Sequence, residues 1–87
     1  MRHFASPQFW QHYKQLPKDV QQLADKRYEL LKHNPQHPSL HVKQIGRFWS
    51  VRVGLRYRAV AVEGPIGLVW FWIGTHAEYD GLIRRSS

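Results

Sequence analysis

The spacing of apolar residues changes once along this chain, at Asn34-Pro35. Before that point apolar side chains recur every three to four residues, as on one face of a helix, and after it they alternate or run together, as in strands. No repeat, linker or low-complexity stretch divides the 87 residues, so we expect a single domain over residues 1–87. Helices followed by strands are typical of an α+β domain with two layers.

The first half predicts two amphipathic helices. Ser6 and Pro7 provide an N-cap followed by a proline at the first helical position, and the apolar spacing then continues to Leu16. The segment Lys18–His33 carries apolar residues on one face and charged residues on the other. We expect the two helices to form an antiparallel hairpin whose apolar side covers one face of a sheet.

One strand of the sheet is expected at the N-terminus, and the others are expected in the second half, after a loop with the sequence NPQHPSL. The strand candidates are Arg2–Ala5, His41–Ile45, Phe48–Val53, Arg56–Val62 and Gly67–Gly74. Apolar residues fill Val69–Ile73 without alternation, which favours a central strand covered on both faces. A short helix is expected over Ala77–Arg85. The sequence thus predicts an antiparallel sheet of four to five strands, with the helical hairpin on one face and the other face open.

Composition limits the classes of function. The chain has 13 Lys and Arg against 6 Asp and Glu, no Cys, and 43% apolar residues. The absence of Cys excludes disulfides and thiolate sites, and the apolar content is too high for a disordered polycation. No signal-peptide pattern or membrane-length apolar run is present, so we expect a cytoplasmic protein without membrane contact. A net charge of +7 favours polyanionic partners, nucleic acid among them.

Basic residues within the predicted strands are the first candidate binding groups. Alternation places Arg52 on one face of its strand, and Arg56 and Arg58 together on a face of the next, with Lys43 on the strand before. An arginine fork matches phosphate oxygens better than lysine does. Two interpretations remain open: these residues bind RNA phosphates, or they pack over apolar neighbours and pair with carboxylates.

Polar groups that follow the apolar strand are candidates for proton transfer. His76, Tyr79 and Asp80 come directly after the strand, and an imidazole suits acid–base chemistry near neutral pH. A simple surface role for this histidine is the competing interpretation. Three further histidines at four-residue spacing lie among prolines that prevent a helix, so no metal site is expected; they are His33, His37 and His41.

Taken together, these segments resemble the RelE/ParE superfamily of bacterial toxin–antitoxin toxins. The resemblance rests on a short first strand, the helices FWQHYKQLP and DVQQLADKRYELL, the loop NPQHPSL, and the sheet WSVRVGLRYRAVAV…VWFWIGTHAEYD. It covers nearly the whole chain, and the segment in which a basic strand precedes Tyr-Arg-Ala-Val is its strongest part.

The resemblance implies a metal-independent endoribonuclease that cleaves mRNA, usually within the ribosome, and needs no cofactor. By position, Arg52 and Arg58 resemble the phosphate-contacting arginines. His76 falls where members carry an arginine, or close to where others carry a histidine, beyond the last strand, and is the acid–base candidate. Tyr79 or Asp80 then lies in the C-terminal segment that supplies a further acid–base or stacking group.

The resemblance also implies an acidic cognate antitoxin as partner. Two alternatives stay open. In the first, the chain resembles the ParE branch, which has the same fold and inhibits DNA gyrase without ribonuclease activity. In the second, it is a non-catalytic basic RNA-binding module. The equivalence of Lys43 to a family position is less close than that of the arginines.

Overall fold

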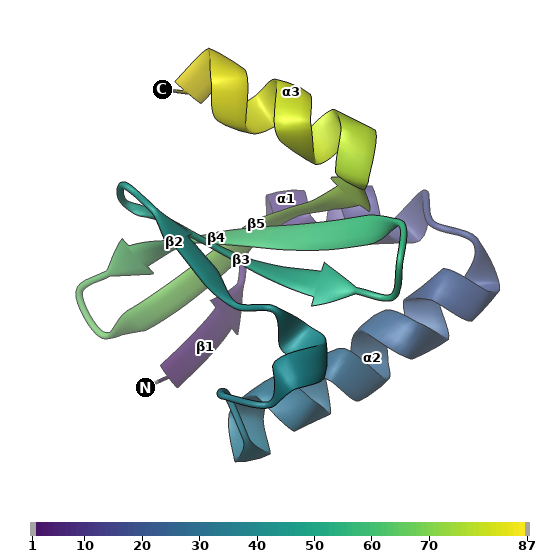
Figure 1. Ribbon diagram of the computed structural model, residues 1–87, viewed down its shortest axis with the longest axis horizontal. Coiled ribbons are helices and arrows are strands. Elements are labelled where there is room, and N and C mark those ends of the chain that lie inside the picture. Colours follow the sequence, from purple (N-terminus) through teal and green to yellow (C-terminus); the bar gives the residue numbers. More distant parts are fainter. Residues whose placement is uncertain (1, 87) are drawn as a thin grey trace.

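The computed structural model describes residues 2–86 and contains a five-stranded sheet and three α-helices (Figure 1). The strands are β1 (Arg2–Ala5), β2 (Lys43–Ile45), β3 (Phe48–Val53), β4 (Tyr57–Gly64) and β5 (Gly67–Thr75). The helices are α1 (Pro7–Lys14), α2 (Lys18–His33) and α3 (His76–Ser86), with a short 3-10 helix at Pro38–Leu40. The expected α+β architecture is confirmed, and α2 and β3 have the predicted bounds.

The sheet is mixed, which corrects the prediction of an antiparallel sheet. Its order is β1-β5-β4-β3-β2. The strands β2 to β5 are antiparallel neighbours in sequence order, whereas β1 pairs in parallel with β5. A parallel pair needs a long crossover connection, and here the whole chain between β1 and β5 provides it. Strand alternation predicts that β1 is a strand but says nothing about its direction.

The two N-terminal helices begin where the sequence indicates. The Ser6 hydroxyl oxygen accepts a hydrogen bond from the Phe9 amide at 3.3 Å and caps α1. A second bond, from the Tyr13 hydroxyl to Asp25 at 2.9 Å, joins α1 to α2. The apolar core lies between α2 and one face of the sheet, the core face. Its buried members are Ala24, Leu31, Leu40, Val51, Val53, Ala59, Ala61, Leu68, Trp70 and Ile73.

Two strands begin later than predicted, for local reasons. The backbone at His41 is left-handed, with φ at +43°, and ends the 3-10 helix, so β2 begins only at Lys43. Gly54 turns the chain between β3 and β4 with φ at +68°, and a Cβ there would lie 2.7 Å from the Leu23 side chain. The turn extends through Arg56, so this residue precedes β4 and does not belong to it.

The opposite face of the sheet, called here the second face, is not fully open. Helix α3 rises from the end of β5 and crosses one end of this face, as Figure 1 shows. Beneath it, Val60 is fully buried and Tyr79 of α3 is 5% exposed. The expected C-terminal helix is confirmed, but the expected open face is wrong at this end because the helix folds back over the sheet.

Candidate functional site

Two arginines lie opposite each other on the second face. Arg52 of β3 and Arg58 of β4 are partners in the antiparallel register, so their side chains leave the same face side by side. Within residues 2–86 neither forms an ion pair with a carboxylate. The Nε atom of each is buried without a hydrogen-bond partner. Two like charges held together in this way favour an anion between or beside them.

Arg58 is held inside the domain. Its side chain is 1% exposed, and its Nη2 donates to the Ser50 hydroxyl at 2.8 Å and to the His41 carbonyl at 3.1 Å. Burial lowers the pKa of Arg58, and the charge of Arg52 lowers it further, whereas Tyr79 raises it. The guanidinium stays charged at neutral pH, because an arginine in a protein keeps its proton.

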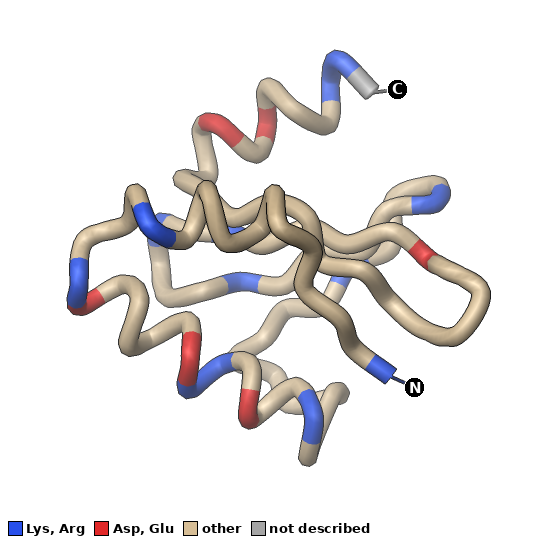
Figure 2. The backbone as a smooth tube through the Cα atoms, turned by 180° about the vertical axis from the view of Figure 1, so that it is seen from behind, with Lys and Arg blue, Asp and Glu red and all other residues tan. Residues whose placement is uncertain are grey.

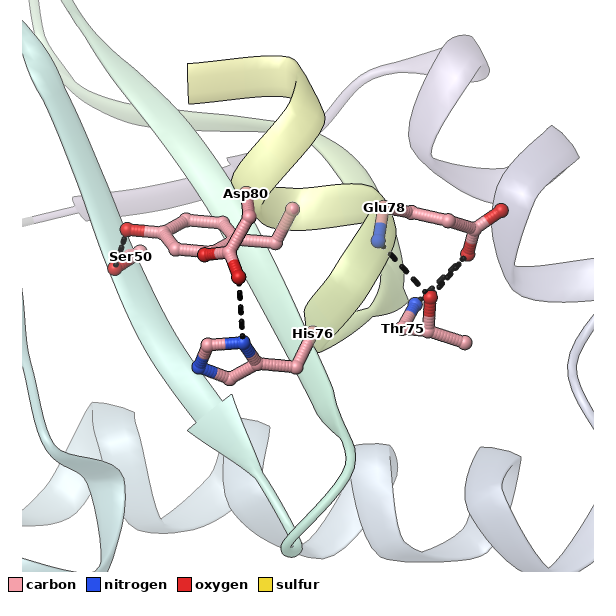
Figure 3. Close-up of polar contacts among 6 residues, drawn as sticks. Ser50, Thr75, His76, Glu78 and Asp80 are labelled. Carbon is pink, nitrogen blue, oxygen red and sulfur yellow. Dashed lines mark hydrogen bonds and ion pairs between the residues drawn. The ribbon is translucent and has the colours of Figure 1, made fainter. Parts of the chain in front are cut away.

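Tyr79 covers this arginine from above. The centre of its ring lies 5.0 Å from the Arg58 guanidinium carbon, which is a cation–π contact. Its hydroxyl lies 3.3 Å from the Ser50 hydroxyl, the contact drawn in Figure 3. The Ser50 hydroxyl thus joins Arg58 and Tyr79. A phosphate oxygen would have to displace the tyrosine to reach the Arg58 guanidinium.

His76 and Asp80 form the exposed part of the site. The Nδ1 atom of His76 lies 3.4 Å from a carboxylate oxygen of Asp80, one helical turn further along α3 (Figure 3), and both side chains are 46% exposed. The imidazole ring also meets the ring of Tyr79 edge-on, with 5.8 Å between the centres. The three proton-carrying groups predicted from the sequence therefore do come together, on the first turns of α3.

A cap fixes the start of α3. The carboxylate of Glu78 accepts hydrogen bonds from the Thr75 amide and hydroxyl, each at 2.9 Å, and the Thr75 hydroxyl oxygen accepts one from the Glu78 amide at 3.1 Å (Figure 3). The two bonds that the carboxylate accepts from Thr75 lower the pKa of Glu78, chiefly the one from the Thr75 backbone amide. The His76 amide donates to the Arg56 carbonyl at 2.7 Å, which ties the helix to the turn before β4.

The remaining predicted binding residues lie at the margin. Lys43 is exposed on the edge strand β2, directly opposite Ser50 in the register, and so on the same face as the arginines. The Arg56 side chain is exposed in the turn, so the prediction that it shares a strand face with Arg58 is wrong. It lies outside β4 because Gly54 makes a longer turn than the two-residue one expected.

Sequence reasoning missed two members of the site. The His41 carbonyl accepts a hydrogen bond from Arg58, and the His41 Nε2 lies 3.5 Å from Arg52 Nη1. The prediction of a strand from His41 gave no reason to place this residue against the arginines. Ser50 lies two residues before Arg52 on β3, and so on the same face. Its alternation with Arg52 was the one available signal. The other two of the three spaced histidines, His33 and His37, show no such role, and no cluster of metal ligands forms among residues 2–86.

Neither a family model nor a curated protein sequence matches the chain. Several solved structures do match, among them the following three. The RelB–RelE antitoxin–toxin complex from Methanococcus jannaschii matches with a TM-score of 0.69 at 14% identity, over 91% of this chain and 96% of that chain. The YoeB/ParE toxin from Agrobacterium tumefaciens matches with a TM-score of 0.65 at 15% identity, over 87% of this chain and 99% of that chain. The isolated RelE toxin of E. coli matches with a TM-score of 0.61 at 11% identity, over 98% of this chain and 97% of that chain. The chain has the RelE/ParE toxin fold.

Charge is distributed unevenly over this RelE/ParE fold. Figure 2 shows the acidic residues on the helices and at one place in the sheet. They are Asp19, Asp25, Glu29, Glu63, Glu78 and Asp80. The strand residue among them, Glu63, accepts a hydrogen bond from the Trp49 indole at 3.0 Å and belongs with the core face. The strands thus place only basic charge on the second face. Within residues 2–86 no helix is long and apolar enough to cross a membrane.

Proposed function

We propose that this protein is the toxin of a toxin–antitoxin module and a metal-independent endoribonuclease that cleaves mRNA. The observation that carries the proposal is the Arg52–Arg58 pair, which lacks an ion-pair partner within residues 2–86 and lies beside the proton-carrying side chains of α3. The RelE/ParE fold supports the same assignment.

RNA supplies the nucleophile for such a reaction. The 2′-oxygen attacks the adjacent phosphorus as its proton passes to a base, and the bond to the 5′-oxygen breaks as that oxygen receives a proton from an acid. The products are a 2′,3′-cyclic phosphate and a free 5′-hydroxyl. Preorganised positive charge stabilises the phosphorane oxygens, which is the role proposed for Arg52 and Arg58. His76 serves as acid or base, assisted by Tyr79 and Asp80.

Arg52 is the arginine that substrate meets first. Its side chain is half-buried, whereas Arg58 lies under Tyr79. In the proposed mechanism the tyrosine swings away from Arg58 as the phosphate enters. The phosphate then replaces the tyrosine ring as the partner of the guanidinium, with a charge-assisted contact in place of a cation–π contact.

The proposal is tested by expressing the protein and mapping RNA ends, in cells and with purified ribosomes present or absent. We expect cleavage that leaves 2′,3′-cyclic phosphates and continues in EDTA. A single 2′-deoxy substitution on the 5′ side of the cleaved bond should stop it. Cleavage of the deoxy substrate, or inhibition by EDTA, would contradict the mechanism. The comparison of the two ribosome conditions decides whether the ribosome is required.

Gyrase inhibition is a second candidate, and the burial of Arg58 favours it. An arginine that is 1% exposed serves the fold first, and the fold also occurs in the YoeB/ParE toxin. In this case RNA would stay intact, whereas purified DNA gyrase would stall and DNA breaks would accumulate. The two assays on one preparation separate the candidates.

The proposed partner is an acidic, partly disordered antitoxin, and the proposed location is the cytoplasm. The Methanococcus RelE-like toxin was solved together with RelB. In this chain a net charge of +7 would attract such a segment. If a small acidic reading frame lies beside the gene, its co-expression should relieve toxicity and yield a complex that purifies at low salt.

A further inference from the structure

A row of apolar side chains crosses the second face at the end not covered by α3. Register pairs connect it across all five strands: Phe4 opposite Val69, Val69 opposite Val62, Val62 opposite Phe48, and Phe48 opposite Ile45. We call these five residues, together with Phe71, the apolar row. Phe4 is 37% exposed and Ile45 is 40% exposed, and the others are half-buried.

Phe71 joins the row through a bulge. The pairing of β5 with β4 passes from Ala61–Trp70 to Val60–Trp72, so Phe71 is an extra residue without a register partner. Its ring lies 6.1 Å from the ring of Phe48, at an angle of 52°. The bulge thereby sets a second phenylalanine beside the first.

The core does not require this row, because the core cluster lies on the opposite face. Single exposed apolar residues are common, but a row that spans a whole sheet indicates a surface made for a partner. Three of its members are phenylalanines, which offer flat faces as well as apolar area.

Charge around the row shows what kind of partner fits. The Arg47 guanidinium lies over the Phe48 ring, 5.3 Å from its centre. Arg2 precedes Phe4 by two residues on β1, and Lys43 precedes Ile45 by two on β2, so both share the second face. No strand carboxylate reaches this face within residues 2–86. A partner must therefore combine negative charge with flat apolar groups.

The row is continuous with the arginine pair. Phe48 and Arg52 belong to β3 and lie on the same face, four residues apart, which is about 13 Å along a strand. A single-stranded nucleic acid bound at the arginines could extend along β3 to the row. Proteins that bind single strands combine a basic path for the phosphates with aromatic side chains on which bases stack.

We propose that the apolar row is a stacking surface for the bases of single-stranded RNA next to the cleaved phosphate, with Phe48 and Phe71 as the contacts. The inference rests on the proposed function, and it names how substrate is held. A second copy of the chain fits less well, because an apolar interface between two rows would bring two sets of Arg2, Lys43 and Arg47 together without counter-charge.

The test measures binding and not cleavage. A short, fluorescein-labelled 2′-O-methyl RNA has no free 2′-hydroxyl to attack, and a matched strand with abasic positions keeps the phosphates but lacks the bases. Wild-type protein should bind the strand with bases about 5- to 150-fold more tightly for each stacked base, as measured by fluorescence anisotropy. Phe48→Leu should lose most of this difference while binding the abasic strand as before.

Trp10→Leu is the matched control. Trp10 is an aromatic residue that is 46% exposed on α1, outside the row, so its loss should leave the preference for bases intact. Thermal unfolding of each variant reports whether the fold survives. If Phe48→Leu is unfolded, Phe4→Leu on the edge strand replaces it.

Equal binding of the two strands by wild type, or an unchanged preference in Phe48→Leu, would overturn the inference. Weakened binding of the acidic partner by Phe48→Leu, without any effect on RNA, would overturn it in favour of a protein-docking surface. The ribonuclease assay is read separately. Cleavage without base preference contradicts only the stacking surface, and base preference without cleavage contradicts only the proposed reaction.

Discussion

Tyr79 lies over Arg58, with 5.0 Å between the ring centre and the guanidinium carbon. The tyrosine is the residue through which α3 covers the buried arginine, and its hydroxyl also reaches Ser50 at 3.3 Å. The proposed catalytic charge is therefore present in the fold but screened from solvent by a side chain of the helix that follows the sheet. Access to Arg58 and the position of α3 are linked.

Replacing Tyr79 by Ala should expose Arg58. The variant loses a buried ring, which destabilises the fold by about 3 kcal/mol, and it opens a path from solvent to the guanidinium. Modification by an arginine-specific dicarbonyl, followed by mass spectrometry of peptides, should show Arg58 reacting in the variant and protected in wild type. Arg52, half-buried in both proteins, serves as the internal reference.

Tyr79→Phe is the control for this prediction. It keeps the ring over Arg58 and removes only the hydroxyl next to Ser50, a change worth about 1 kcal/mol. Arg58 should then remain protected. Equal reactivity of Arg58 in wild type and Tyr79→Ala would mean that the helix does not limit access.

Arg52→Ala should separate activity from stability. Within residues 2–86 its one side-chain hydrogen bond, to His41 Nε2, is long at 3.5 Å, so the free energy of unfolding should change little. Loss of one preorganised charge next to the reacting phosphate should lower the cleavage rate by on the order of 100-fold. Lys26→Ala, an exposed residue on α2, is the matched loss of charge and should cleave like wild type. Activity unchanged in Arg52→Ala would exclude this residue from the site.

Arg58→Ala is a less clean experiment than Arg52→Ala. The sequence predicted that Arg58 lies on this face of the sheet, but it did not predict that the side chain is buried. Its burial depends on α3, which folds back over the face. Removal of its side chain also removes both hydrogen bonds from Nη2, to Ser50 and to His41. A buried polar group that loses its partner destabilises a fold, so loss of toxicity alone would not distinguish catalysis from folding.

Local patterns predicted the elements well because each depends on neighbours in sequence. The helical spacing of apolar residues over Lys18–His33 and the N-cap at Ser6 each involve only residues close in sequence. Both features are present in the structure. The parallel direction of β1 and the cover that Tyr79 gives to Arg58 depend on contacts between distant segments. A single sequence records no such contact, which is why the sheet was expected to be antiparallel and its second face open.

Glu78 should make the cap of α3 sensitive to acid. Its pKa is lowered from the ordinary value of 4.5, mainly by the hydrogen bond from the Thr75 amide. A carboxyl with a depressed folded pKa adds stability above its unfolded pKa, and this is lost as pH falls through the folded value. Wild type should therefore unfold at a higher temperature than Glu78→Gln at pH 7. This difference in unfolding temperature should disappear when the pH falls below the ordinary pKa of 4.5. A gap of the same size at acid pH would contradict this.

His3 should give a second pH dependence, near neutrality. Its Nδ1 accepts a hydrogen bond from the Trp70 indole at 3.1 Å, so that nitrogen must be unprotonated in the fold. Burial lowers the pKa of His3 from 6.5, and the charge of Lys32 contributes. The unfolded chain binds the proton more readily than the folded one. The free energy of unfolding should therefore decrease as the pH falls below 6.5, and above 6.5 His3 should add no pH dependence.

His3→Phe isolates the effect of this histidine from that of the other five. Phenylalanine keeps a ring between Trp70 and Tyr28, which His3 contacts at 6.1 Å and 6.4 Å between ring centres, but it cannot titrate. At pH 7.5 the free energy of unfolding of wild type should exceed that of His3→Phe by about 1 kcal/mol, because in wild type the Trp70 indole has a hydrogen-bond acceptor. The difference should shrink by pH 5, where protonation of His3 competes with that bond. Denaturant unfolding at the two pH values measures it, and a difference unaffected by pH would show that the bond between β1 and β5 does not control the ionisation of His3.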